Sequence, residues 1–389
     1  MKLTVRADAF VDFKEVLRPN KLIIEEGKIK GSVKPDEEVE EVELELGGKG
    51  RISTPAFVSL HTYMSLYPFR FGIFSGYRNA TELLSVMTEN DAYHFALLSA
   101  YHLAKSGVSA VAFSEPFGDT VARAVTEVGL RPYIIVGAGC WESKTDWKNE
   151  FKVLFQRWSS YGRRDVMIKV CETEELEEAA GVAKESGTAV ILDRTVPIHL
   201  VEKKGLIGEV TFIALGGGAR SDIDLVKKYK IPLAFTPTYE ISKFPLSEFD
   251  PALTLDLSPR YDILHELSVA TSRLILKPDE ALKAGTFRGF QLLGLQAGVF
   301  EIDKEADLVV FEFREPPNFP YDGLVPYETV IFGSHNVETL IVKGEPVVDG
   351  GVPINVGLSH VEKALEKVRE VDERVSKAVR NMATSGDPK

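Results

Sequence analysis

The chain has 389 residues, of which 44% are hydrophobic and 27% charged, and its formal net charge is -12. These values are typical of a globular protein with room for one large domain and a smaller one. The acidic balance argues against nucleic acid or an anionic membrane as the main partner, and no apolar run is long enough to span a bilayer. The two cysteines, Cys140 and Cys171, lack Cys-x-x-Cys spacing, so the sequence predicts no thiolate zinc site and favours a reducing cytoplasm.

Residues 1 to about 52 alternate polar and apolar side chains between glycine-rich turns, which predicts short β-strands. From there to about residue 260, apolar strands alternate with helices, including one long helix expected over 81–106. Eight strands are predicted, the first from Ala56 and the others at 108–113, 132–136, 166–170, 189–193, 210–215, 232–235 and 251–255. Strict alternation of helices with fully apolar strands predicts a parallel sheet, and eight units predict a closed (β/α)8 TIM barrel. The alternative is an open, doubly wound sheet, but no Gly-x-Gly-x-x-Gly follows the first strand.

Helices are expected over 261–296, and strands return at 308–312, 337–342 and 346–348. Strands at both ends of the chain predict a small β-sandwich domain built jointly by the two termini. The expected domains are therefore 1–52 with 300–356 for the sandwich, 53–299 for the barrel and 357–389 for a C-terminal helix.

The segment Thr54-Pro55-Ala56-Phe57-Val58-Ser59-Leu60-His61-Thr62-Tyr63 ends an apolar run in His-x-Tyr. Residues two apart on a strand share a face, so His61 and Tyr63 are expected to point to the same side, at the barrel mouth. A core strand ending in one polar residue is the alternative interpretation. The segment resembles the first barrel strand of the amidohydrolase superfamily, where Pro-Gly-x-x-x-x-His-x-His supplies two metal ligands. Here Ala56 stands for the glycine and Tyr63 for the second histidine.

A second resemblance lies in the C-terminal third of the chain. The segments 281–295, Gly298 to Val310 with its Ala306-Asp307-Leu308-Val309-Val310 strand, and 336–348 resemble the superfamily elements that leave the barrel and close the small domain. Their order is most similar to the branch of cytosine, guanine and adenosine-type deaminases and triazine hydrolases. This resemblance implies the fold, but these packing and turn residues carry no chemistry.

The resemblance also implies a ligand set for one divalent metal ion, whose bound water becomes hydroxide near neutral pH. By strand ends, the matching residues are His61, Asp193 and Asp256, which would hold zinc, iron or manganese and carry the catalysis. Asp250 and Asp262 are alternatives to Asp256. The set is incomplete, because Ala214 or Leu215 stands at the strand-six histidine and Val196 at the proton-shuttling glutamate. Equally, His61 and the two acids could form a metal-free buried cluster neutralised by Arg194 or Arg260.

Further residues are expected around the same mouth. Tyr63, Tyr67, Arg194 and Glu115 are candidates for substrate binding, Glu115 because it follows the second strand. Lys169 could be the carbamylated lysine of two-metal relatives, but its place inside a strand favours a structural role.

Three functions remain open from the sequence. The first is a hydrolase that acts on a non-peptide C–N bond, deaminase-like or amidohydrolase-like, by water attack at the barrel mouth. The second is a catalytically inactive family member that binds a small molecule or partner without metal. The third is a metal-independent enzyme using Asp193 and Asp256 as paired acids. We expect a cytoplasmic protein with a small-molecule ligand, no nucleic-acid or membrane partner, and a possible homodimer.

Overall fold

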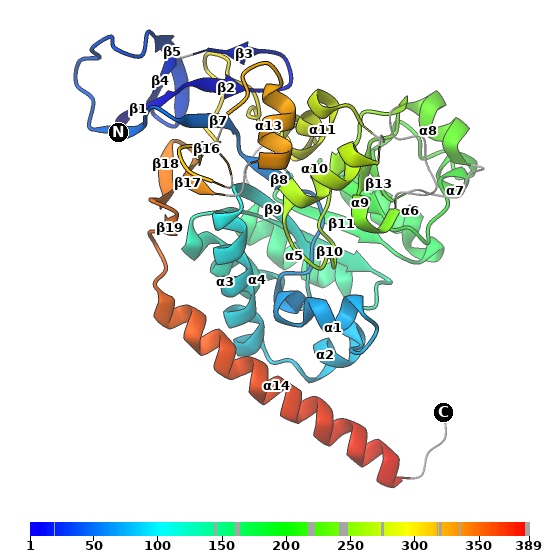
Figure 1. Ribbon diagram of the computed structural model, residues 1–389. Coiled ribbons are helices and arrows are strands. Elements are labelled where there is room, and N and C mark those ends of the chain that lie inside the picture. The colour runs from blue at the N-terminus through cyan, green and yellow to red at the C-terminus, as the bar shows by residue number, and fades with distance from the viewer. Residues whose placement is uncertain are drawn as a thin grey trace.

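A computed structural model describes residues 1–18, 20–143, 146–159, 164–216, 222–240, 248–273, 276–316, 318, 321–333 and 336–385, without the side chains of 239, 240 and 379–385. The centre of this structure is a parallel sheet with the strand order β15-β14-β13-β12-β11-β10-β9-β8 (Figure 1). Its strands are β8 (Phe57–Ser59), β9 (Val108–Ser114), β10 (Arg131–Ala138), β11 (Val166–Val170), β12 (Ala189–Leu192), β13 (Thr211–Leu215), β14 (Leu233–Phe235) and β15 (Ala252–Leu253). The predicted TIM barrel is confirmed, with neighbouring strands paired in sequence order.

The ends of the sheet meet immediately beyond β8 and β15. The Leu60 amide donates to the carbonyl of Leu253, and the amides of Leu255 and Asp256 both donate to the carbonyl of His61, each at 3.0 Å. A parallel bridge between Thr62 and Asp256 continues this contact. The hydrogen bonds that close the barrel therefore place the predicted site residues His61 and Asp256 side by side.

Helices cover the barrel and connect its strands. They are η1 (Met64–Phe69), α1 (Arg70–Phe74), α2 (Ala80–Val86), α3 (Glu89–Lys105), α4 (Gly118–Val128), α5 (Trp147–Trp158), η2 (Thr173–Glu175), α6 (Leu176–Ser186), α7 (Ile198–Lys203), α8 (Ile223–Tyr229), α9 (Pro237–Glu240), α10 (Ile263–Ser272), α11 (Pro278–Gly285) and α12 (Phe287–Leu292). The single helix predicted over 81–106 is wrong, because the chain breaks between α2 and α3. There Thr88 caps α3 and Asp91 bonds back to the Thr88 amide, and this capping box starts a new helix.

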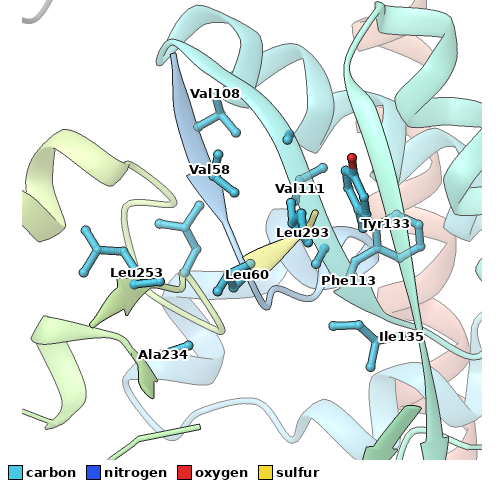
Figure 2. Close-up of a cluster of buried hydrophobic side chains, with 14 of the residues drawn as sticks. Val58, Leu60, Val108, Val111, Phe113, Tyr133, Ile135, Ala234, Leu253 and Leu293 are labelled. Carbon is cyan, nitrogen blue, oxygen red and sulfur yellow. The ribbon is translucent and has the colours of Figure 1, made fainter. Parts of the chain in front are cut away.

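The barrel core is filled by fully buried apolar side chains from neighbouring strands. Val58 and Leu60 meet Val111 and Phe113 from β9, with Leu253 from β15 nearby (Figure 2). The strands are apolar on both faces, as the burial of every residue of β9 and β11 shows, because helices cover the outer face.

Both ends of the chain build two further sheets beside the barrel. One has the order β5-β4-β1-β6 and the other β19-β18-β17-β16-β7-β2-β3. Their strands are β1 (Lys2–Ala7), β2 (Ala9–Val11), β3 (Val16–Leu17), β4 (Asn20–Glu25), β5 (Lys28–Val33), β6 (Leu44–Gly47), β7 (Arg51–Pro55), β16 (Leu308–Glu312), β17 (Val337–Val342), β18 (Glu345–Asp349) and β19 (Val352–Pro353), with α13 (Pro326–Gly333) between β16 and β17. The pairing of β7 with β16 joins the two termini as expected.

One buried ion cluster fixes these sheets to the barrel. Arg131, at the start of β10, pairs with Glu305 at 2.6 Å and with Asp307 just before β16. The Arg131 side chain is 2% exposed and that of Asp307 is fully buried, so each charge depends on the other.

The last described element is α14 (Leu358–Ser385), which packs along α2 and α3 and then extends past them (Figure 1). Arg374 ties it to this surface through Asp91, at 2.6 Å. In the part of the chain that is described, no helix has the length and hydrophobicity needed to cross a lipid bilayer.

Candidate active site

The imidazole of His61 and the carboxylate of Asp256 form a buried pair at the barrel mouth. His61 lies two residues beyond β8 and is fully buried, and its Nδ1 contacts Asp256 Oδ1. The other carboxylate oxygen accepts hydrogen bonds from Arg194 and, at 3.0 Å, from Thr236. Asp256 has a left-handed backbone with φ of 43°, a conformation that aspartate tolerates better than most residues. The sequence prediction that these two residues share the mouth agrees with this geometry.

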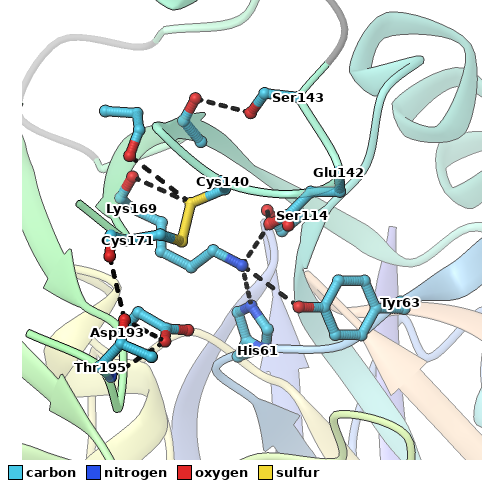
Figure 3. Close-up of a disulfide and its surroundings, with 12 residues drawn as sticks. His61, Tyr63, Ser114, Cys140, Glu142, Ser143, Lys169, Cys171, Asp193 and Thr195 are labelled. Atoms are coloured by element: carbon cyan, nitrogen blue, oxygen red, sulfur yellow. Dashed lines mark hydrogen bonds and ion pairs between the residues drawn. A yellow bond between two sulfur atoms is a disulfide. The ribbon is translucent and has the colours of Figure 1, made fainter. Parts of the chain in front are cut away.

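The ammonium group of Lys169 lies at the centre of the site (Figure 3). Lys169 belongs to β11 and is fully buried, and its Nζ is 3.2 Å from His61 Nε2 and 3.2 Å from Tyr63 Oη. It also forms an ion pair with the carboxylate of Glu142, which lies in the segment after β10. His61 and Tyr63 therefore share a side, as the strand period predicts, and both contact the same nitrogen.

Burial and neighbouring charges set the protonation of this cluster. Burial lowers the pKa of His61, and the Lys169 charge lowers it further, so the imidazole is neutral at neutral pH. Its Nδ1 then donates to Asp256, and its Nε2 accepts from Lys169. Burial opposes ionisation of Asp256, but His61 and Arg194 outweigh it and hold the pKa of this carboxyl well below its usual range. Burial raises the pKa of Tyr63 well above 10, so the phenol keeps its proton.

Glu115 is a second buried acid near this cluster. It follows β9 and accepts hydrogen bonds from the amide of Ser65, at 2.9 Å, and from its hydroxyl. Burial raises the pKa of Glu115 to about 7, against the effect of these hydrogen bonds. Such a group can hold or release a proton near neutral pH, which general acid–base catalysis requires.

Of the three metal ligands expected from the family resemblance, His61 and Asp256 are in contact, whereas the carboxylate of Asp193 faces its own turn. The Asp193 carboxylate accepts hydrogen bonds from the Thr195 amide and hydroxyl, at 3.2 and 3.1 Å, and so caps its own turn. Among the residues that the structure describes, no group of three or more His, Cys, Asp or Glu side chains could hold a metal ion. The expectation that His61, Asp193 and Asp256 together bind a metal therefore finds no support in this geometry and stays a prediction. Asp193 still acts on the pKa of Tyr63, so it lies near the cluster without joining it.

The other candidate acids at strand eight have structural roles. Asp250 pairs with Lys283 at 2.9 Å, and Asp262 caps α10 by accepting from the Leu264 amide. The strand-six residues Ala214 and Leu215 are both buried and apolar.

Tyr67 lines a cavity that His61 does not line. Its ring stacks on His102 at 5.0 Å between ring centres, and both residues line a cavity of about 480 Å³. Arg260 lines the same cavity. The structure gives Tyr67 no contact with His61, so its expected part in substrate binding stays a prediction.

The two cysteines are joined in a disulfide beside the site, a pairing that the sequence did not predict (Figure 3). Cys140 follows β10 and Cys171 follows β11, and the register that pairs Ala138 with Val170 brings them to a Cα–Cα distance of 5.0 Å. The 31-residue sequence separation conceals this proximity, because α5 and its flanking loops fill the interval. Glu142 lies two residues after Cys140, so the disulfide anchors the segment that carries the partner of Lys169.

Glu142 is not among the site residues predicted from the sequence, and Lys169 was expected to have a structural role there. The available signal was one charged residue within the buried apolar strand Val166-Met167-Ile168-Lys169-Val170. A lysine fully buried in this way requires a partner, and Glu142 provides it.

Comparison with known proteins supports the interpretation of the fold. The family model described as Amidohydrolase family matches residues 258–347. The 5'-deoxyadenosine deaminase of Methanobrevibacter smithii is 23% identical, over 92% of this chain and 96% of its own length. The 5-methylthioadenosine/S-adenosylhomocysteine deaminase of Caldanaerobacter subterraneus is also 23% identical, over 87% and 90%.

Solved structures give the same result. An adenosine deaminase from Xanthomonas campestris with bound zinc superposes with a TM-score of 0.82 at 16% identity, over 96% of this chain and 98% of that one. The atrazine chlorohydrolase of Arthrobacter aurescens, complexed with zinc, has a TM-score of 0.78 at 15% identity, over 94% and 100%. The fold is thus that of these solved structures. The chain is similar to the Amidohydrolase family over residues 258–347 and, over most of its length, to proteins named as deaminases and a chlorohydrolase, the kinds that the sequence resemblance implies.

Proposed function

We propose that this chain hydrolyses a C–N bond of a small molecule, and that it removes the exocyclic amino group of an adenosine-type nucleoside. The substrate class is suggested by the names of the relatives, which are 5'-deoxyadenosine and 5-methylthioadenosine/S-adenosylhomocysteine deaminases. In such a reaction water supplies the new oxygen and ammonia leaves, so protons pass from the water to the leaving amine.

The observation that carries this proposal is the line of contacts from Asp256 through His61 to Lys169 at the carboxyl ends of the strands. Barrel enzymes place their chemistry at this end. Asp256 fixes the tautomer of His61 and would stabilise its protonated form, while Lys169 Nζ and His61 Nε2 lie within reach for proton exchange. Glu115, with its pKa of about 7, provides a second group able to carry a proton.

Two features fit an aromatic amine as the ligand. Glu142 Oε2 is buried and has no hydrogen-bond partner among the described residues, so it is available to accept from a ligand N–H. The rings of Trp141 and Tyr63 lie 5.3 Å apart, and Trp141 is 43% exposed, which offers a stacking surface beside that carboxylate.

The superfamily's metal does not fit the donors found here. The zinc of the solved relatives supplies hydroxide and positive charge when bound. In this chain His61 and Asp256 are the candidate ligands that remain, and the Nε2 lone pair of His61 already accepts from Lys169. The proton transfers are therefore assigned to the side chains of His61, Lys169 and Glu115.

The test is ammonia release from 5'-deoxyadenosine, 5'-methylthioadenosine and S-adenosylhomocysteine, with product identity checked by mass spectrometry. We expect turnover by the wild type and a loss of at least about 100-fold in His61→Asn and Asp256→Asn. Lys184→Met, on the exposed surface of α6, is the matched control and should keep full activity. Saturable binding of these nucleosides without turnover would instead support the alternative, an inactive family member that retains a ligand site. A cytoplasmic location, a homodimeric state and the domain limits given above remain predictions.

A further inference from the structure

We propose that the ammonium group of Lys169 is the resident cation of the barrel mouth and occupies the place that a divalent metal takes in zinc-binding relatives. This inference rests on the barrel mouth being the site proposed above. It also predicts that the chain works without a bound metal ion.

The contacts of Lys169 resemble the coordination of a small cation. A lysine ammonium has three N–H donors and no acceptor. In this structure it meets three acceptors from two segments, namely His61 Nε2 and Tyr63 Oη after β8, each at 3.2 Å, and the Glu142 carboxylate after β10. Ser114 also donates to Glu142, at 2.6 Å, and so holds this carboxylate in place. All three donors are therefore satisfied inside a fully buried site.

Two of these acceptors come from the His-x-Tyr segment that resembles the metal-binding His-x-His segment of the superfamily. His61 provides Nε2, the atom that is left to bind a metal once Nδ1 is engaged with Asp256. Tyr63 stands at the position of the second histidine and directs its hydroxyl to the same nitrogen. Lys169 therefore uses the lone pairs that a metal ion at this place would need.

The charges of the cluster are already balanced. Glu142 pairs with Lys169 and Asp256 pairs with Arg194, so two carboxylates face two basic groups. A divalent ion placed beside Lys169 would meet its positive charge, and both carboxylates in contact with the cluster already face a basic group. The repulsion between the ion and buried Lys169 would outweigh the weak attraction between the ion and the neutral phenol of Tyr63.

The remaining ligand positions of the superfamily offer no compensation. Asp193 is engaged with Thr195, and the strand-six position is held by the aliphatic side chains of Ala214 or Leu215. A metal would therefore have to displace Lys169 and still lack a full donor set.

The experiment measures zinc binding directly, so it does not depend on activity. Protein from zinc-supplemented medium, purified without chelator, is analysed for metal content and then titrated with Zn²⁺ by equilibrium dialysis. We expect the wild type to carry well under one equivalent. Lys169→Ala should bind Zn²⁺ at least about tenfold more tightly, because it removes the competing charge and frees His61 and Glu142. Adding His61→Ala should abolish this gain, and the surface control Lys184→Ala should match the wild type.

Two results would overturn the inference. One is a wild type that carries about one zinc ion, lost on His61→Ala, and this measurement remains decisive even if Lys169→Ala fails to fold. The other is a folded Lys169→Ala protein, checked by circular dichroism, with no gain in zinc affinity. Ammonia release measured on the same preparations separates the two proposals. An active, zinc-loaded wild type would refute the resident cation only, whereas a metal-free and inactive one would refute the proposed hydrolase only.

Discussion

The Cys140–Cys171 disulfide should contribute a large share of the stability of the chain. It closes a loop with a sequence separation of 31 residues, and a cross-link of that span removes about 3.5 kcal/mol of conformational entropy from the unfolded state. Globular proteins are stable by only about 5–15 kcal/mol, so this is a substantial fraction. We expect the Cys140→Ser/Cys171→Ser double variant to unfold with a free energy lower by about 3–4 kcal/mol.

The assay is urea unfolding followed by far-ultraviolet circular dichroism, with and without a phosphine reductant. Reductant should destabilise the wild type and leave the double variant unchanged, which makes the variant its own control. The parallel pairing of β10 with β11 does not involve the sulfur atoms, so both proteins should keep native secondary structure before the transition. A thiol titration that finds two free cysteines in the unreduced native protein would refute the reasoning. So would a verified reduction that leaves the urea midpoint of the wild type in place.

Three further predictions concern stability, all measured as free energies of unfolding in urea. Burial raises the pKa of Glu115 from 4.5 to about 7, so protonated Glu115 stabilises the fold below pH 4.5, and this stabilisation is lost as the pH rises through 7. Relative to Glu115→Gln, the wild type should therefore lose about 3 kcal/mol of unfolding free energy between pH 4.5 and 7. Parallel pH profiles of the two proteins would contradict this. Arg131→Met should lower the unfolding free energy by about 3–5 kcal/mol, because it leaves the buried Asp307 carboxylate without its cation. Lys184→Met, at an exposed ion pair, should lower it by under about 1 kcal/mol. Equal effects of the two substitutions would refute the burial argument. Gly289→Ala should lower the unfolding free energy by about 1–3 kcal/mol, because the new Cβ would lie 2.6 Å from the Val58 side chain of β8. The Cβ of Gly181→Ala would meet nothing within 4 Å, so this substitution should stabilise α6 by up to about 1 kcal/mol.

The barrel was predictable from the sequence because its strands are apolar on both faces and lie between clear helix signals. The predicted strand 166–170 coincides with β11, and 108–113 differs from β9 by one residue. The break between α2 and α3 also left a signal, since Thr88-Glu89-Asn90-Asp91 is a capping-box pattern that the longer amphipathic period concealed.

The site was only partly predictable, because it depends on side-chain reach rather than on strand order. His61 and Asp256 follow the first and last strands, so the closing of the barrel brings them together whatever the intervening sequence does. Asp193 also ends a strand, but a local turn engages its carboxylate, and the strand order gives no sign of that. Lys169 begins deeper in its strand and reaches the mouth through its long side chain, and Glu142 comes from a segment whose course depends on the disulfide.

The altered positions at the mouth are consistent with one another, which argues for a rebuilt site rather than a decayed one. Loss of a metal from an otherwise intact ligand set would leave carboxylates and imidazoles buried without a counter-charge, a costly arrangement. Here the lysine satisfies His61, Tyr63 and Glu142 together, and Asp256 keeps a cation of its own in Arg194. Random loss of ligands has no reason to supply a buried ammonium with three matching acceptors. The arrangement therefore favours retained chemistry at the mouth, performed with proton-carrying side chains.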